Sequence, residues 1–117
     1  MSLLIQRAHV ISPDVDLPDA ALEIVGAKIK RVIPAGEPLP SCSETYDARG
    51  MRVVPGFIDT HFHGGMGQDV TSEDPSAMPV IAEAKLREGV TSMCPTTLTL
   101  SEEMLAKSLH NIEAYRL

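Results

Sequence analysis

The stretch that decides the fold is Val54-Pro55-Gly56-Phe57-Ile58-Asp59-Thr60-His61-Phe62-His63. It predicts an extended segment that the Pro55-Gly56 pair interrupts. A helix is expected from about Ser76 to Glu88, a second buried strand over 90–98, and a second helix that starts near Ser101 and is still running at Leu117. Strand, helix, strand, helix is the order of a parallel sheet with helical crossovers. The first of these helices is expected to carry its apolar face at Ala77, Val80, Ile81 and Ala84, and the second at Leu105, Leu109 and Ile112. Asp74 or Ser76 is expected to cap the first helix, Gly89 to end it, and Glu83 to pair with Arg87 on its surface.

The first fifty residues are predicted to be β-structure. A hairpin with one solvated face is expected where two apolar stretches flank Gly26-Ala27. Proline-containing turns are expected to interrupt the strands at 12–14 and again at 17–19, and a loop is expected over 34–40. The expected strands are Leu3–Ile11, Ala21–Val25, Lys28–Ile33 and the short Thr45–Asp47.

Composition narrows the class of protein. The chain is 44% apolar and 22% charged, which predicts a globular domain and not a disordered segment. No apolar run approaches the ~20 residues of a membrane helix, so no membrane association is expected. Aromatic residues are only 3% of the chain and basic residues are scattered, so nucleic acid is not an expected partner. Two cysteines, Cys42 and Cys94, predict a reduced cytoplasmic protein in which Cys94 is buried.

Two histidines at the end of the opening stretch carry the candidate chemistry. His61 and His63 are two residues apart on a predicted strand, so both imidazoles leave the same face. From there they can meet at one metal ion with bonds of about 2.0–2.1 Å. Asp59 is expected on that face too, where it orients a ligand or caps the loop. The alternative is a partly exposed pair of strand residues that binds nothing.

Glycines follow the histidines directly. Gly64, Gly65 and Gly67 predict a flexible or tightly turning loop, of the kind used where the backbone must approach a ligand closely. Asp69 is a candidate to close this loop near a substrate, the alternative being that its carboxylate only caps a turn. His9 and His110 are expected at the surface without a role in the site.

Residues 54–63 resemble the P-G-[FL]-[IV]-D-x-H-x-H signature of the amidohydrolase superfamily, with almost every position filled as the superfamily has it. Residues 63–70 are similar to the H-G-x-x-G-x-D loop of N-acetylglucosamine-6-phosphate deacetylases, and residues 88–99 resemble that family's G-[VT]-T-S-x-x-P-T-T-x-T strand. The hairpin at Gly26 and residues 47–50 also resemble the small β-sandwich that precedes the barrel in these enzymes. The resemblance covers essentially the whole chain, which corresponds to about the first third of a typical member.

The resemblance implies an α/β fold in two parts. Residues 1–50 would form the N-terminal part of a small β-sandwich, and residues 51–117 the first strand, helix, strand and helix of a metal-dependent (β/α)8 TIM-like barrel. That barrel is incomplete in this chain, because closure takes ~200 residues or more. Its two strands would expose edges that invite further pairing. A truncated chain, a proteolytic product and a fragment that associates with its own copies all fit this expectation.

The resemblance also implies an activity, the removal of the N-acetyl group from N-acetylglucosamine 6-phosphate in amino-sugar catabolism. His61 and His63 would be metal ligands, and the loop containing Gly64, Gly65 and Asp69 would lie at the substrate. The implied cofactor is a divalent metal ion, zinc first and iron or another ion otherwise, which activates a water and polarises the amide carbonyl.

The remaining parts of such a site are expected downstream. The family's catalytic aspartate and its further metal ligands, a glutamate and two histidines, lie on later strands, so no catalytic residue is expected in this chain. The chain alone is expected to be inactive and the complete enzyme a homo-oligomer. Some relatives carry Gln and Asn in place of the two histidines and hold one metal, so the pair kept here suggests a second metal ion.

Two alternatives remain open at this point. One is another amidohydrolase, such as a cyclic-amide hydrolase of the dihydroorotase or hydantoinase type, although those usually place Arg, Asp or Pro-rich loops after the H-x-H pair. The other is a non-catalytic β-rich module that acts through self-association.

Overall fold

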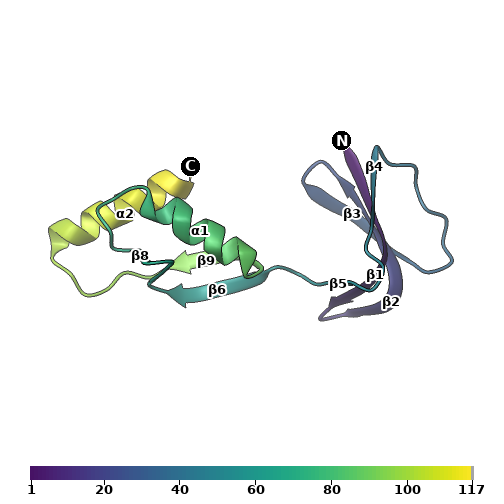
Figure 1. Cartoon of the computed structure of the whole chain (residues 1–117), viewed down its shortest axis with the longest axis horizontal. Coiled ribbons are helices and arrows are strands. Elements are labelled where there is room, and N and C mark those ends of the chain that lie inside the picture. The colour runs from purple at the N-terminus through teal and green to yellow at the C-terminus, as the bar shows by residue number, and fades with distance from the viewer. Residues whose placement is uncertain (117) are drawn as a thin grey trace. The chain divides into compact units, whose positions relative to one another are not determined.

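The computed structural model describes residues 1–116, which fold into two compact units, Met1–Pro55 and a second unit that begins at Gly56 (Figure 1). The expectation that the second helix is still running at Leu117 lies outside the described residues. None of the helices within residues 1–116 is both long enough and apolar enough to cross a bilayer.

The first unit is a five-stranded sheet in the order β3-β2-β1-β4, with β5 also pairing with β1. The first three strands are antiparallel neighbours, whereas β4 and β5 run parallel to β1. Small residues, Ala8, Ala20 and Ala48, pack with Val10 and Leu22 to form its main core. The strands are β1 Ser2–Ser12, β2 Val15–Val25, β3 Lys28–Pro34, β4 Glu44–Asp47 and β5 Arg52–Val53.

The hairpin predicted around Gly26-Ala27 is present. Val25 pairs with Lys28, and Gly26 takes φ 60° as the first central residue of the two-residue turn. The predicted break at 17–19 is wrong, because β2 continues through Pro18. The β1–β2 register shifts there, since Ala8 and Val10 pair with Ala20 and Leu17. Pro18 therefore lies in a bulge, where its missing N–H removes no ladder hydrogen bond.

One carboxylate is buried in this unit. Glu23 on β2 has a side chain only 6% exposed, and its two oxygens accept hydrogen bonds from Lys30 Nζ and Arg31 Nε, both at 2.8 Å. The hydrogen bond from Lys30, followed by that from Arg31, holds the pKa of Glu23 below its usual value. Both cations come from β3, so this triad fastens the hairpin across its two strands.

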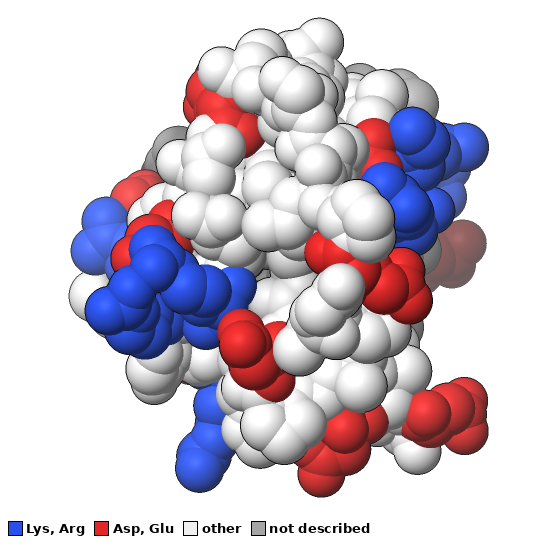
Figure 2. Space-filling view, turned by 90° about the vertical axis from the view of Figure 1, so that its right-hand side faces the viewer, with Lys and Arg blue, Asp and Glu red and all other residues white. Residues whose placement is uncertain are grey.

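The surface of the first unit includes an apolar groove. On the face that Figure 2 shows, acidic and basic side chains gather in adjacent groups around a broad neutral area. Ile29, Val32 and Val54 are large apolar side chains that stay exposed in this unit. The apolar residues that line the groove are Val10, Ile11, Val15, Leu22, Ile29, Val32, Val53, Val54 and Pro55.

The second unit is built on two parallel strands with a helix between them. β6 Phe57–Phe62 pairs with β9 Val90–Pro95, and α1 Ala77–Arg87 connects them, followed by α2 Glu102–Arg116. Both helices lie on one face of the strand pair (Figure 1). Between β6 and α1 a small hairpin is formed by β7 Gly64–Gly65 and β8 Gln68–Asp69. The core consists of Phe62, Val70, Met78 and Ile81, with Met93 and Ile112 packed against it.

The boundaries of α1 follow from its flanking residues as predicted. Asp74 accepts hydrogen bonds from the backbone N–H of Ser76 at 2.9 Å and from its hydroxyl at 2.8 Å, so its carboxylate organises the turn before the helix. Gly89 ends the helix at φ 88°, a conformation that side chains other than glycine rarely adopt. The predicted pair of Glu83 with Arg87 forms at 2.6 Å. Glycine is also required at Gly56, where a Cβ atom would come within 2.0 Å of the Thr91 hydroxyl oxygen.

The predicted burial is wrong at three places in this unit. Val80 is exposed and Met78 is buried instead, because α1 turns Met78 and Ile81 toward Phe62. On α2, Leu109 is exposed and the small Ser108 is buried where the helix meets the preceding loop. Cys94 is exposed, because β9 pairs only with β6 among residues 1–116 and both helices cover the same face.

The Glu23 triad predicts how the stability of the first unit depends on pH. A folded-state pKa below the unfolded one means that Glu23 stabilises the fold above the unfolded pKa of about 4.3. That contribution is lost as pH falls from there through the folded value. We expect Glu23→Gln to lower the urea midpoint at pH 7 and to flatten its decline in acid. Glu37→Gln, in the exposed turn after β3, is the matched control. Parallel acid profiles of wild type and Glu23→Gln would contradict this interpretation.

Candidate metal centre

The two candidate ligands face each other at the end of β6. His61 lies on the strand and His63 directly follows its last residue, Phe62. Their Nε2 atoms are 3.2 Å apart, and the rings are perpendicular with centroids 5.0 Å apart. His61 is exposed and His63 is half-buried. The structure therefore brings together the two side chains that the H-x-H spacing pairs.

Thr96, which follows β9, orients the ring of His63. Its Nδ1 is 2.9 Å from the carbonyl oxygen of Thr96. Because a carbonyl only accepts, Nδ1 carries the proton, which leaves Nε2 with its lone pair directed at His61. A hydrogen bond between the two Nε2 atoms then requires the tautomer of His61 that carries its proton on Nε2. Orientation of a ligating histidine through its second nitrogen is the usual arrangement at metal sites.

The pairing of β6 with β9 is irregular beside the histidines. Asp59 pairs with Met93 and Phe62 with Pro95, so two residues of β6 lie opposite one residue of β9. A bulge of this kind redirects side chains. Phe62 turns into the core beside α1, and the residues on either side of it turn away from that core.

Asp59 does not share the histidine face, and the expectation from regular alternation is wrong here. Its Oδ2 is 3.0 Å from the Nζ of Lys85 on α1, and the same ammonium lies 5.3 Å from the centre of the Phe62 ring. Asp59 and Phe62 therefore both point toward α1. The other oxygen, Oδ1, accepts the backbone N–H of His61 at 3.2 Å.

The ion pair of Asp59 with Lys85 favours the charged form of both residues. The hydrogen bond from Lys85, followed by that from the His61 backbone, lowers the pKa of Asp59. The hydrogen bond to Asp59 in turn raises the pKa of Lys85 above its usual value. Neither residue was singled out for this contact by the sequence. A helical lysine gives no signal by itself, and the bulge depends on how β9 pairs.

The histidine pair fits a divalent metal in its donor chemistry. An ion bonded to both Nε2 atoms at about 2.0–2.1 Å and spanning their separation would subtend about 100° between them, near the tetrahedral angle. The pair does not make a complete site. Within residues 1–116 no group of three or more His, Cys, Asp or Glu side chains is placed to hold a metal.

The glycine-rich segment forms a tight hairpin. Met66 and Gly67 turn it at φ 53° and 75°. A Cβ on Gly64 would lie 2.1 Å from the carbonyl oxygen of Gln68, so cross-strand packing requires that glycine. Gly65 is different, because a Cβ there meets no atom within 4 Å and its φ is not positive. Hairpin geometry explains Gly64 and Gly67 but leaves Gly65 unexplained.

Asp69 ends the hairpin and caps the following turn. Its Oδ1 accepts the backbone N–H of Thr71 at 2.7 Å and also contacts the Thr71 hydroxyl. The hydroxyl, then the backbone N–H, holds the pKa of Asp69 below its usual value, and the nearby His63 acts in the same direction. This geometry matches the turn-capping alternative. A role of Gly64, Gly65 or Asp69 at a substrate stays a prediction.

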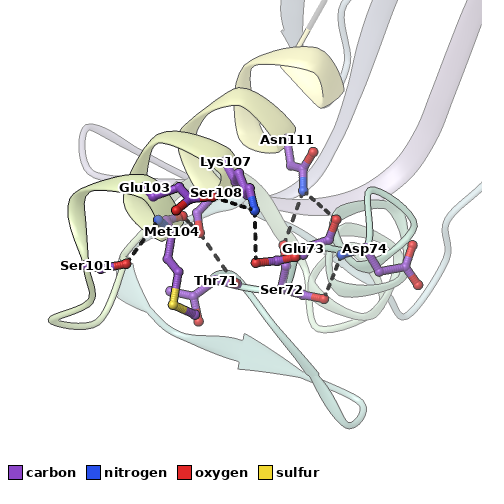
Figure 3. Close-up of polar contacts among 10 residues, drawn as sticks. All are labelled: Thr71, Ser72, Glu73, Asp74, Ser101, Glu103, Met104, Lys107, Ser108 and Asn111. Atoms are coloured by element: carbon purple, nitrogen blue, oxygen red, sulfur yellow. Dashed lines mark hydrogen bonds and ion pairs between the residues drawn. The ribbon is translucent and has the colours of Figure 1, made fainter.

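Helix α2 holds the loop that follows the hairpin (Figure 3). The buried Ser108 hydroxyl donates to the carbonyls of Met104 at 2.8 Å and Thr71 at 3.3 Å. The Asn111 amide donates to the carbonyls of Ser72 and Glu73, both at 3.2 Å. The segment that carries Asp69 is thus anchored to α2 through backbone carbonyls.

The two remaining histidines were expected to have no role in the site, and neither contacts the pair within its own unit. His9, in the first unit, is 2.6 Å from Asp16 through its Nε2. His110 is exposed on α2. Thr96, at the end of the predicted second strand, contributes its backbone carbonyl to the site, and no side-chain pattern indicates such a role.

Comparison with known proteins finds clear relatives, although no family model matches the chain. An N-acetylgalactosamine-6-phosphate deacetylase of Escherichia coli O157:H7 is 41% identical over 81 residues, which are 69% of this chain and 21% of that protein. An N-acetylglucosamine-6-phosphate deacetylase of Bacillus subtilis is 26% identical over 115 residues, 98% of this chain and 29% of that protein. The chain thus spans between about a fifth and three-tenths of the length of these relatives.

Solved structures give the same result for the fold. The N-acetylglucosamine-6-phosphate deacetylase of Pasteurella multocida superposes with a TM-score of 0.88 at 22% identity, covering 99% of this chain and 31% of that one. A D-hydantoinase superposes less closely, with a TM-score of 0.63 at 27% identity over 97% of this chain and 24% of that one. In sequence and in fold, the chain is similar to the N-terminal part of the N-acetylglucosamine-6-phosphate deacetylases, within the amidohydrolase superfamily.

Proposed function

We propose that this chain is the N-terminal part of a metal-dependent deacetylase that removes the acetyl group from N-acetylglucosamine 6-phosphate. The observation that carries the proposal is the pair of Nε2 atoms of His61 and His63, 3.2 Å apart and oriented for one ion. The likeness of the flanking segments to deacetylases supports the substrate class. The parent protein is accordingly an enzyme of amino-sugar catabolism that acts on a linear amide.

The contribution of this chain to catalysis would be to bind and orient. His61 and His63 would hold a divalent ion, zinc in the first instance, through nitrogens whose direction Thr96 and the strand bulge fix. The chemistry that such an ion supplies is a water of lowered pKa and a polarised amide carbonyl. The proton carrier, an aspartate, and the further ligands would come from strands beyond those described, so the chain by itself would be inactive.

The two units would be the beginnings of two larger structures. The first would be part of a small β-sandwich, since its apolar groove and the exposed Ile29 and Val54 need a covering layer. In the second, β6-α1-β9-α2 would be the start of a TIM-like barrel. Phe57 and Ile58 on β6 are exposed, which favours burial against further strands.

The free thiols of Cys42 and Cys94 suit a reducing cytoplasm, and a homo-oligomer is the proposed assembly.

The nearest alternative differs only in the sugar. The relative from Escherichia coli at 41% identity is named for N-acetylgalactosamine 6-phosphate, which makes that epimer the second candidate substrate. A cyclic amide is less well supported, because the likeness to a D-hydantoinase is weaker than that to the deacetylase. A non-catalytic module that acts through self-association would leave the paired histidines without a purpose.

The proposal can be tested by measuring acetate release by the complete enzyme. Acetate release from N-acetylglucosamine 6-phosphate should stop on treatment with a chelator and return with zinc. His63→Ala should reduce kcat/KM by at least about 100-fold, because it removes a ligand. His110→Gln on the surface of α2 is the control that should leave the rate unchanged. Metal-loaded enzyme that releases no acetate from either epimer would refute the deacetylase assignment, and one ion at most per active site would refute a second metal.

Substitutions at Gly64 and Gly65 distinguish a role in folding from a role in substrate binding. Gly64→Ala should destabilise the protein by about 1–3 kcal/mol, since the added methyl group meets the Gln68 carbonyl. Gly65→Ala should leave the urea midpoint unchanged or slightly raised, because the site has room and alanine restricts the unfolded chain. If Gly65 faces the substrate, that variant should raise KM in the complete enzyme. An unaltered KM would remove Gly65 from the proposed site.

A further inference from the structure

A polar connection runs from α1 through Asp59 to the backbone of His61. Lys85 Nζ lies 3.0 Å from Asp59 Oδ2, and Asp59 Oδ1 accepts the His61 N–H at 3.2 Å. The two oxygens of one carboxylate thus join a helix to the strand segment that carries the metal-ligand candidates. This connection uses no substrate and no metal atom.

The position of that N–H explains why it needs a partner. The bulge between Asp59 and Phe62 places Thr60 and His61 opposite a single residue of β9. A bulged residue loses part of its ladder hydrogen bonding, so its backbone N–H takes another acceptor. Asp59 supplies the acceptor from its own strand. The carboxylate therefore supports the bulge that turns His61 and His63 away from the core.

Lys85 keeps the carboxylate in this place. Its side chain is 18% exposed and that of Asp59 is 23% exposed, so the pair is shielded far better than a typical surface ion pair. The ammonium also lies over the Phe62 ring, 5.3 Å from its centre. Phe62 stands between the two histidines in sequence. Lys85 therefore contacts the strand at both sides of the bulge.

We propose that Lys85 is a positioning residue, which through Asp59 holds the bulge that aims His61 and His63 at one point. The inference rests on the proposed function, in which those histidines bind the metal. It goes beyond it by assigning a role to a residue of α1 whose observed contacts are Asp59, Glu88 and the Phe62 ring. Removal of the charge would release Asp59 and allow the His61 segment to regularise, which would separate the two Nε2 atoms.

The test uses the 117-residue chain, labelled with ¹⁵N and studied by NMR without metal. In the wild type we expect a proton on Nδ1 of His63, an unprotonated Nε2, and a nuclear Overhauser effect between the two rings. Lys85→Met keeps the length of the side chain but removes the charge, and it should weaken the ring contact and mix the tautomers of His63. Lys85→Arg, which can still bind the carboxylate, should restore both signals.

Lys107→Met is the matched control. Lys107 is also an ion-paired lysine of the second unit, at 3.2 Å from Glu103 and 3.5 Å from Glu73, and its side chain is 48% exposed. It has no connection to β6 in these contacts, so its loss should leave the histidine signals unchanged. Zinc titration of the complete enzyme gives a second measurement. Lys85→Met should weaken the affinity of the pair about tenfold, as loss of an outer contact typically does, and Lys107→Met should not.

Two results would overturn the inference: histidine signals in Lys85→Met that match the wild type, or equal changes in Lys107→Met. Should Lys85→Met unfold, Asp59→Asn probes the same connection from its other end. It keeps an acceptor for the His61 N–H but not the charge, and adding Lys85→Met to it should then change the histidine signals little. Failure of the complete enzyme to bind zinc, while the metal-free signals of the chain respond, would refute the metal assignment alone. Acetate release by the complete enzyme judges the deacetylase proposal separately.

Discussion

The parallel pairing of β6 with β9 is the interaction on which the second unit depends. Backbone hydrogen bonds close it at both ends, from the Phe57 N–H to the Gly89 carbonyl and from the Thr96 N–H to the Phe62 carbonyl, both at 2.9 Å. The second of these brings Thr96 to the position where its own carbonyl orients His63. Two strands that α1 separates in the sequence thus build the histidine pair together. The end of β6 carries the two imidazole rings, and the residue that follows β9 determines which nitrogen of the His63 ring is free to bind a metal.

Much of the fold follows from local sequence signals. The turn at Gly26, the end of α1 at Gly89 and the pairing of Glu83 with Arg87 depend on residues close in sequence, and all three appear as predicted. The closeness of His61 and His63 likewise follows from their spacing. The bulge does not, because strand alternation presumes a regular ladder and the irregularity arises only when β9 is paired. The reversed direction of Asp59 and its contact with Lys85 therefore had to come from the structure.

Burial was harder to predict than secondary structure, for a related reason. Val80, Cys94 and Leu109 belong to apolar patterns that predict burial, yet all three are exposed. A hydrophobic period identifies the element and the side of it that is apolar. It does not say whether the neighbour that covers that side lies within the same 117 residues. The exposed Phe57 and Ile58 on β6 illustrate the same limit for the strands.

Gly56 has a structural role in the H-x-H signature. It has no chemistry to contribute, and it is glycine because the Thr91 side chain of β9 occupies the space where a Cβ would stand. Asp59, another fixed position of the motif, satisfies a backbone N–H. These two residues of the motif therefore act in packing and backbone hydrogen bonding, whereas the proposed chemistry rests on the histidines. A match at Gly56 or Asp59 is accordingly evidence about architecture, and only a match at the histidines bears on a reaction.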